Sequence, residues 1–353
     1  TPPESYRDYI LWLKNQSKTK VEQFWKDKLQ GFSGATTLAT SIAPRPEPQL
    51  EGHEALYLDW TKEPTQRLRE QAQRWRVTPN TLIQAAWLLL LQRYTGHATV
   101  CFGATVAGRP ATLPGSDAIL GLFINTLPII QTPEPEMLLG QWLQALQTYN
   151  IEVRDYEHAS LADVQRWSGQ GGQSLFDSII VFENFPLDER LHNAEQQQLT
   201  FGEVKARGVT NFAMDLEVRL GNTLTIEFMY LRNRFTPEAT EQIRTSFETL
   251  LCAMLDNPDA TLGSLAMLSN NEQQRLNQRN ILAPLQETAP LLAEVIRSHA
   301  AATPGAVAVV CADAQLTYGE LESRANHLAH YLIAQGIGPE SFVGIALERS
   351  VDV

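Results

Sequence analysis

The spacing of apolar residues predicts several helices within the first 255 positions. Between 18 and 29 the apolar residues recur three or four apart, which is typical of an amphipathic helix. Further helices are expected at 63–75, 79–94, 137–149 and 236–255. The last of these has Thr236 at its N-cap and Pro237 in its first turn. The stretch 79–94 is apolar almost all round, so we expect it to be buried.

Strand patterns alternate with these helices. Extended apolar runs occur at 100–106, 120–130 and 178–182. Two runs that alternate apolar and polar residues, 214–220 and 224–231, flank Gly221 and Asn222 and predict a hairpin. The stretch 31–55 is rich in Gly, Pro, Ser and Thr, so it is expected to cross the molecule as an irregular segment.

A second globular pattern begins after a polar stretch. Residues 269–288 are rich in Gln and Asn and predict a linker or an exposed helix. A helix at 291–302, a strand at 306–310, a helix at 318–334 and a strand at 342–347 follow. Thr317 and Glu320 predict a capping box at the start of the second helix. This alternation indicates an α/β layered fold, and 353 residues are enough for two domains.

Composition and charge narrow the classes of function. The chain is 43% hydrophobic and 19% charged, which suits a globular protein, and its net charge of −12 argues against nucleic-acid binding. The longest apolar run, 85–91, is too short to span a membrane. Cys101, Cys252 and Cys311 lie in apolar stretches and are expected to be buried, reduced thiols, which fits a cytoplasmic location. Both ends of the chain are interpreted as cuts in a longer protein.

A search for self-sufficient chemistry finds no complete active site. The chain has no G-x-S-x-G, no phosphate-binding G-x-x-x-x-G-K-[ST] and no H-E-x-x-H sequence. His327 and His330 lie three apart on a predicted helix, but no third ligand is near them in sequence, so no metal site is expected. The other histidines are isolated, and none can be assigned as a general base.

Six segments in order resemble the core motifs of condensation domains of nonribosomal peptide synthetases. They are YRDYILW at 6–12, FWKDKLQG at 24–31, FGATVAGRP at 102–110, ILGLFINTLP at 119–128, SLFDSIIVFENFP at 174–186 and VTNFAMDLEV at 209–218. FTPEATEQI, from Phe235, resembles the last helix of that domain. Further on, LTYGELESRANHLAHYLIAQGI at 316–337 resembles the first core motif of an adenylation domain.

The resemblance implies a domain plan and a fold. We expect the C-terminal lobe of a condensation domain at 1–268, a linker at 269–288, and the start of an adenylation domain at 289–353. The implied fold is α/β: a chloramphenicol-acetyltransferase-like lobe, with a mixed sheet and flanking helices, followed by the truncated α/β start of an adenylate-forming domain.

The chain also departs from the family pattern. Ile130 stands where the family often has an Arg, and the stretches 156–162 and 171–175 differ from the usual motifs. The HHxxxDG motif, which belongs to the preceding lobe, is not in this chain, nor are the ATP-binding motifs of the adenylation domain. Two alternatives therefore stay open: an epimerisation or heterocyclisation relative, and a degenerate, non-catalytic platform on which carrier domains dock.

The resemblance implies amide-bond formation between carrier-tethered aminoacyl and peptidyl thioesters. The expected partners are peptidyl carrier domains with their phosphopantetheine arms, the N-terminal lobe, and the rest of the adenylation domain with ATP and Mg²⁺. No nucleic acid, membrane or bound metal is expected. Polar residues that interrupt or end apolar runs are proposed to line the substrate tunnel: Asn125, Thr126, Glu183, Asn184, Thr210 and Asn211. The alternative is that they satisfy neighbouring backbone groups.

Arg109 is a candidate contact for a phosphate or carboxylate, beside the alternative of a structural ion pair. No catalytic residue is assigned in this chain. By itself it is therefore expected to form no peptide bond.

Overall fold

A computed structural model describes residues 5–43, 46–47, 49–110, 112–183, 208–280, 291–312 and 314–353. The chain forms two compact units, Thr1–Arg275 and Leu276–Val353. Each unit has its own sheet and its own helices.

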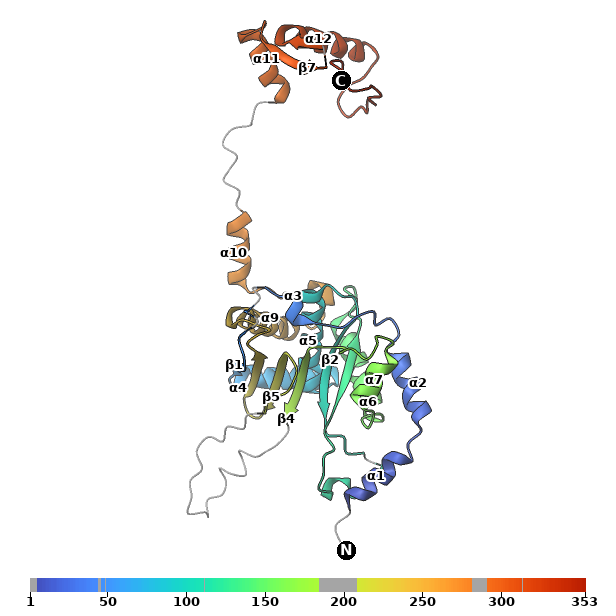
Figure 1. The fold of residues 1–353 in the computed structure, drawn as a ribbon. Helices are drawn as coiled ribbons and strands as arrows, with labels where there is room; N and C mark the ends of the chain where they lie inside the picture. Colours follow the sequence, from blue (N-terminus) through green and yellow to red (C-terminus); the bar gives the residue numbers. More distant parts are fainter. Residues whose placement is uncertain are drawn as a thin grey trace. The chain divides into compact units, whose positions relative to one another are not determined.

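The described residues of the first unit form a mixed six-stranded sheet in the order β1-β6-β5-β4-β2-β3 (Figure 1). Its strands are β1 (His53–Trp60), β2 (Val100–Val106), β3 (Asn125–Gln131), β4 (Ser178–Glu183), β5 (Met214–Leu220) and β6 (Leu224–Leu231). Strand β4 runs parallel to both β2 and β5, whereas the other neighbours are antiparallel. The hairpin expected around Gly221 and Asn222 is the β5–β6 pair.

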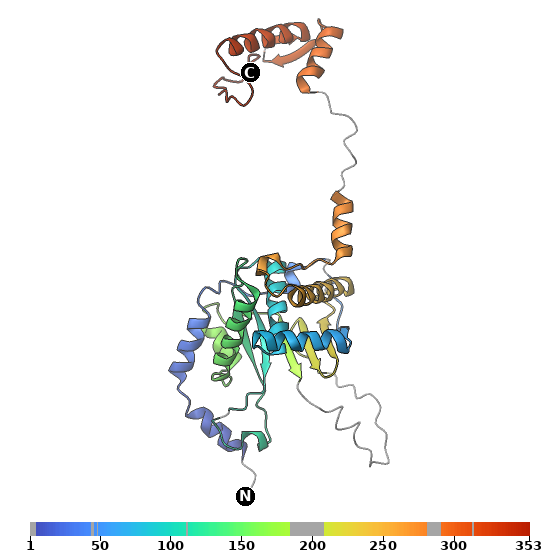
Figure 2. The same ribbon diagram turned by 180° about the vertical axis from the view of Figure 1, so that it is seen from behind.

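Helices cover one face of this sheet (Figures 1 and 2). They are α4 (Lys62–Trp75), α5 (Pro79–Thr95), α6 (Leu139–Arg154) and α9 (Pro237–Asp256). Helix α5 contacts β2, α4, α6 and α9, so the expected burial of its apolar surface is confirmed. The indole N–H of Trp87 on α5 donates to the Ser178 hydroxyl on β4 at 3.1 Å, and this bond ties the helix to the middle of the sheet.

Shorter elements surround this core. They are α1 (Tyr6–Lys14), α2 (Lys18–Lys28), α3 (Leu38–Ser41), a 3₁₀ turn Ser116–Ala118, α7 (Leu161–Trp167) and a second 3₁₀ turn Leu262–Ser264. Helix α10 (Asn270–Asn280) follows, and the boundary between the two units falls within it. The Asp177 carboxylate accepts hydrogen bonds from the backbone N–H groups of Leu38 and Ala39, both at 2.9 Å. A residue 138 positions away therefore satisfies the start of α3.

Several expectations were wrong in detail. The stretch 31–55, expected to be irregular, contains α3 and the start of β1. Within 120–130 only Asn125 onward is a strand, because the preceding residues pack around Phe123 instead of joining the sheet. Helix α6 begins two residues later than expected and runs on to Arg154. The expectation of buried thiols holds for Cys101, whereas Cys252 and Cys311 are half-buried.

The second unit consists of α11 (Leu292–Ala302), β7 (Val307–Cys311), β8 (Ala314–Thr317) and α12 (Tyr318–Ala334). The expected capping box is confirmed, because the Thr317 hydroxyl accepts from the Glu320 N–H at 3.3 Å and Glu320 Oε2 accepts from the Thr317 N–H at 2.9 Å. The strand expected at 342–347 is wrong: those residues have no partner strand among the described residues, and Phe342 is fully exposed.

Candidate functional site

The face of the sheet opposite the helices carries a row of polar side chains. Successive side chains of a strand point to opposite faces. On β5, Leu216 and Val218 are fully buried in the core, so Glu217 and Arg219 project from the other face. Glu227 of β6 lies directly opposite Glu217 in the antiparallel register and shares that face.

Arg219 is the centre of this group. Its Nε lies 2.9 Å from Glu217 Oε1, and its Nη2 lies 2.8 Å from Glu227 Oε2. Glu183, at the end of β4, is a third carboxylate 3.7 Å from Arg219 Nε. The Tyr57 hydroxyl of β1 donates to Glu227 Oε1 at 3.1 Å. Four strands therefore contribute to what we name the Arg219 cluster: Tyr57, Glu183, Glu217, Arg219 and Glu227.

The Arg219 cluster has three carboxylates for one guanidinium. The Glu227 side chain is only 7% exposed, and like charges directly opposite each other on neighbouring strands are unfavourable. Arg219 relieves this repulsion by bridging Glu217 and Glu227. Burial, followed by the neighbouring Glu217 charge, raises the pKa of Glu183. The surplus of negative charge favours donors and cations as ligands of this face.

Of the members of this cluster, only Glu183 was among the residues that the sequence predicted to line the tunnel. Glu217, Arg219 and Glu227 could have been found from the predicted hairpin, because pairing 214–220 with 224–231 around Gly221 places Glu217 opposite Glu227. Tyr57 could not, because it lies on the distant strand β1. Asn184, the neighbour of Glu183 in the expected tunnel set, lies outside the described residues.

Thr210 belongs to a separate polar contact on the same face of the sheet. Its hydroxyl lies 2.7 and 2.8 Å from the two carboxyl oxygens of Asp215 and accepts from the Phe212 N–H at 3.1 Å. Asp215 is 6% exposed, and burial raises its pKa to about 6. Asn211, the next residue of the expected set, is exposed.

Asn125 and Thr126 lie in the edge strand β3. The Asn125 side-chain N–H₂ donates to the carbonyls of Glu157 and Ala159, at 2.8 and 2.6 Å, and its oxygen accepts from the Thr126 N–H at 2.9 Å. Asn125 therefore ties the turn between α6 and α7 to the start of β3. Thr126 pairs with Thr105 of β2.

Arg109 holds the segment that connects β2 to β3. Its guanidinium donates to the carbonyls of Ser116 and Ile119, the second at 3.1 Å. It also lies 4.3 Å from the centroid of the Phe123 ring, which is a cation–π distance. In the structure these contacts bind residues 116–123 to Arg109, just after β2, and a contact between Arg109 and a phosphate or carboxylate stays a prediction.

The anchored segment presents an apolar row. Ile119 and Phe123 are buried against aromatic rings of α1, and the Tyr6 hydroxyl donates to the Leu122 carbonyl at 2.7 Å. The alternating side chains point away, and they are 91%, 75% and 64% exposed at Leu120, Leu122 and Ile124. Apolar side chains gathered on an ordered segment are typical of an interaction surface.

Two further observations concern metals and membranes. In the described ranges, no group of three or more His, Cys, Asp or Glu side chains is arranged to hold a metal ion. None of the described helices combines the length and the apolar character that a membrane span requires.

Comparison with known proteins identifies the family. Residues 1–277 match the family described as Condensation domain, and residues 296–353 match the family described as AMP-binding enzyme. One of the linear gramicidin synthase subunits of Brevibacillus parabrevis is 37% identical over 356 residues, in an alignment that covers 100% of this chain and 7% of that protein. The chain thus spans a small part of the length of this relative.

Solved structures share the fold. A nonribosomal peptide synthetase bound to α-methyl-L-serine-AMP aligns with a TM-score of 0.70 at 20% identity, over 95% of this chain and 38% of that chain. The first condensation domain of the calcium-dependent antibiotic synthetase aligns with a TM-score of 0.54 at 14% identity, over 71% of this chain and 54% of that chain. The motifs, the mixed sheet with its helices and these matches agree: the chain belongs to the condensation-domain family of nonribosomal peptide synthetases and continues into the start of an adenylation domain.

Proposed function

We propose that residues 1–268 are the second half of a condensation domain that, in the full-length protein, forms an amide bond between two carrier-tethered substrates. The observation that carries this proposal is the Condensation domain match over residues 1–277. The alignment of this chain with 54% of a solved condensation domain supports it, because the rest of that domain has no counterpart in the alignment.

The proposed reaction joins an acceptor amine to a donor thioester. The amine nitrogen attacks the thioester carbonyl, the C–N bond forms, the C–S bond breaks, and the proton lost by the amine balances the thiol that leaves. Phosphopantetheine arms on carrier domains would supply the thiols, and tethering replaces diffusion by a high effective concentration. The preceding half of the domain would supply the histidine that positions or deprotonates the amine.

This chain would contribute one wall of the tunnel between the two halves. The exposed row Leu120, Leu122 and Ile124 is suited to contact the preceding half, because it is apolar and uncovered among the described residues. Polar groups on the sheet face opposite the helices, Glu183 and Thr210, would meet the substrates. Asn125, Thr126, Asn184 and Asn211 complete the proposed lining.

The end of the chain has a separate proposed role. Residues 269–288 would link the domains, and residues 289–353 would begin an adenylation domain that, when complete, uses ATP and Mg²⁺ to activate an amino acid. We also propose that the full-length protein acts in the cytoplasm and that its partners are carrier domains.

The test compares the full-length protein with the 353-residue chain. Each is mixed with donor and acceptor carriers loaded with aminoacyl groups, and mass spectrometry of the intact carriers detects the product. We expect dipeptidyl carrier from the full-length protein and none from the 353-residue chain. Amide formed by the short chain would refute its expected inactivity.

The other outcomes identify the alternatives. Carriers that bind the full-length protein without reacting would indicate a docking platform. A product with inverted stereochemistry would indicate an epimerisation relative, and a product that has lost a further water would indicate heterocyclisation.

A further inference from the structure

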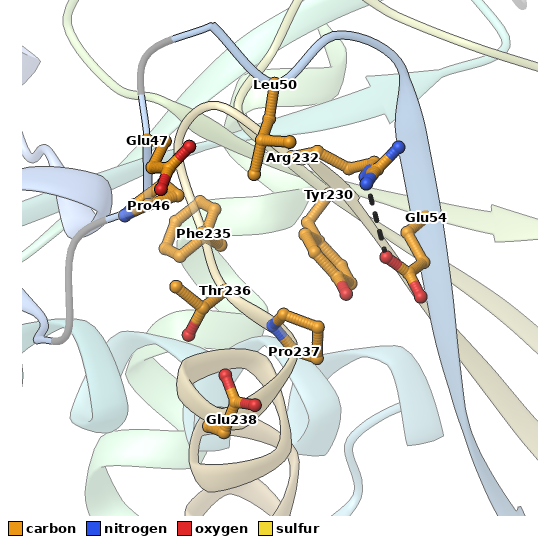
Figure 3. A pocket seen from close by; sticks show the side chains of 10 residues that line it. All are labelled: Pro46, Glu47, Leu50, Glu54, Tyr230, Arg232, Phe235, Thr236, Pro237 and Glu238. Carbon is orange, nitrogen blue, oxygen red and sulfur yellow. Dashed lines mark ion pairs between the residues drawn. The ribbon is translucent and has the colours of Figure 1, made fainter.

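A pocket of about 310 Å³ lies where strand β6 ends and helix α9 begins (Figure 3). Pro46, Glu47 and Leu50, which precede β1, line its other side. Leu50, Phe235 and Pro237 give it apolar walls, and Phe235 is 1% exposed. Leu50 is 36% exposed and forms the outer wall, on the solvent side. None of these residues belongs to the Arg219 cluster or to the apolar row of 120–124.

Tyr230 supplies a polar atom without a partner. Its side chain is 0% exposed, and its hydroxyl makes no hydrogen bond within 3.5 Å to the residues that the structure describes. Its main side-chain neighbour is the Glu54 carboxyl. Figure 3 shows the ring running into the pocket, with the hydroxyl between Pro237 and Glu54. Burial, followed by the charge of Glu54, raises the pKa of Tyr230 to about 12. At neutral pH the hydroxyl is therefore protonated, and its lone pairs are free to accept a hydrogen bond.

The charges around the pocket favour a cation. Three carboxylates line it, those of Glu47, Glu54 and Glu238, against the one guanidinium of Arg232. Arg232 Nε lies 3.8 Å from Glu54 Oε2, so Glu54 already balances this positive charge. Among the described residues of the lining, the carboxylates of Glu47 and Glu238 have no opposite charge, and a cation placed near them gains Coulomb energy.

The start of helix α9 offers little to an anion. Helix N-termini attract anions through free backbone N–H groups, but Pro237 has none. The Ala239 N–H donates to the Thr236 hydroxyl at 3.2 Å, and the Thr240 N–H donates to the Thr236 carbonyl at 3.0 Å. At Pro237, Ala239 and Thr240, therefore, no backbone N–H group is free to bind an anion.

We propose that this pocket binds a primary ammonium or guanidinium group on an aliphatic stem, the chemistry of a lysine or arginine side chain. The cation donates to the Tyr230 hydroxyl and is attracted by the carboxylates of Glu47 and Glu238. The stem packs on Phe235 and displaces the half-exposed Leu50 side chain outward. Long cationic side chains bury their stems against apolar surface in this way.

The test is a titration of the 353-residue chain followed by NMR of its leucine methyl groups. The probes are n-butylammonium and n-butylguanidinium, with n-butanol and butyrate as matched controls of the same stem. We expect a saturable shift of the Leu50 methyl signals with the two cations and none with the controls. Tyr230→Phe keeps the ring and removes only the hydroxyl, and it should weaken cation binding about fivefold, the effect of one lost hydrogen bond.

Further variants distinguish binding in the pocket from cation binding elsewhere on the chain. Glu238→Gln should also weaken the cations, whereas Tyr57→Phe, a hydroxyl of the same sheet outside the pocket, should not. Nα-acetyl-lysine methylamide distinguishes the two sources of the ligand: tighter binding than n-butylammonium assigns the pocket to a protein side chain, and weaker binding assigns it to a free amine. Binding of butyrate in preference, equal cation binding by Tyr230→Phe, or no shift with either cation would each overturn the proposal.

Discussion

The Arg109 guanidinium lies 4.3 Å above the Phe123 ring while it donates to the carbonyls of Ser116 and Ile119. One side chain thus fixes both ends of the segment that carries the exposed row Leu120, Leu122 and Ile124. Arg109 is therefore one anchor of the apolar row, beside the contacts with α1, and its contribution can be tested.

Replacing Arg109 by Met should free this segment without unfolding the sheet. The variant loses a cation–π contact and charged hydrogen bonds, so the free energy of unfolding should fall by about 1–3 kcal/mol. Hydrogen exchange should lose protection in 116–124 and keep it in α5. The matched variant Arg74→Met removes an exposed arginine of α4 and should change neither quantity. Unchanged protection in 116–124 would show that Arg109 does not hold the segment.

Gly121→Ala should destabilise the contact between this segment and α1. A Cβ atom at position 121 would lie 2.1 Å from the Tyr6 ring, so the ring or the backbone must move, at a cost of about 1–3 kcal/mol. At Gly221, in the β5–β6 turn, a Cβ atom meets nothing within 4 Å, and neither glycine has a positive φ. Gly221→Ala is therefore the matched control for urea denaturation. Equal midpoints for the two variants would contradict the close approach of Tyr6.

Ser178→Ala should leave the indole N–H of Trp87 buried without an acceptor. The two side chains are 1% and 0% exposed, so water cannot replace the hydroxyl, and the loss should be about 1–3 kcal/mol. Ser41→Ala, at the exposed end of α3, should stay within about 0.5 kcal/mol of the unmodified chain. Tryptophan fluorescence during denaturation measures both. A Ser178→Ala effect as small as that of the control would contradict the buried bond.

Asp215 predicts a dependence of stability on pH. Its pKa is raised to about 6 in the folded chain, mainly by burial, against about 3.9 when unfolded. Between these values the folded state holds a proton that the unfolded state has lost, so stability is highest below about pH 4 and falls as pH rises to about 6. The shift of about two pKa units corresponds to about 3 kcal/mol.

Asp215→Asn should remove this loss. The compared quantity is the free energy of unfolding of the variant minus that of the unmodified chain. It should be about 2–3 kcal/mol more favourable to the variant at about pH 7.5 than at about pH 4. Measuring the difference between the two chains cancels the pH dependence that they share. Asp155→Asn, an exposed carboxyl, should show no such gain. A pH-independent difference for Asp215→Asn would show that its carboxyl titrates alike in both states.

Local pattern predicted much of the fold. Helix α5 followed from its all-round apolar stretch, the β5–β6 hairpin from two alternating runs around Gly221, and the start of α12 from Thr317 and Glu320. Each depends on residues within a few positions of one another, and such neighbours interact whatever the rest of the chain does. The order of the motifs along the chain likewise indicated the family.

Contacts between distant positions were decided only by the tertiary structure. Strand β1 pairs with β6, placing Tyr57 opposite Glu227, 170 residues away. In the same way, Asp177 satisfies the start of α3. The side chains of the Arg219 cluster come from four strands. Among these side chains, local pattern indicated only Glu183. The order of amino acids was enough to indicate the elements and the family, because local spacing sets helix and strand. The order of strands in the sheet decided which charged side chains meet. Local periodicity predicts that a segment is a strand, but it does not indicate which distant strand it pairs with.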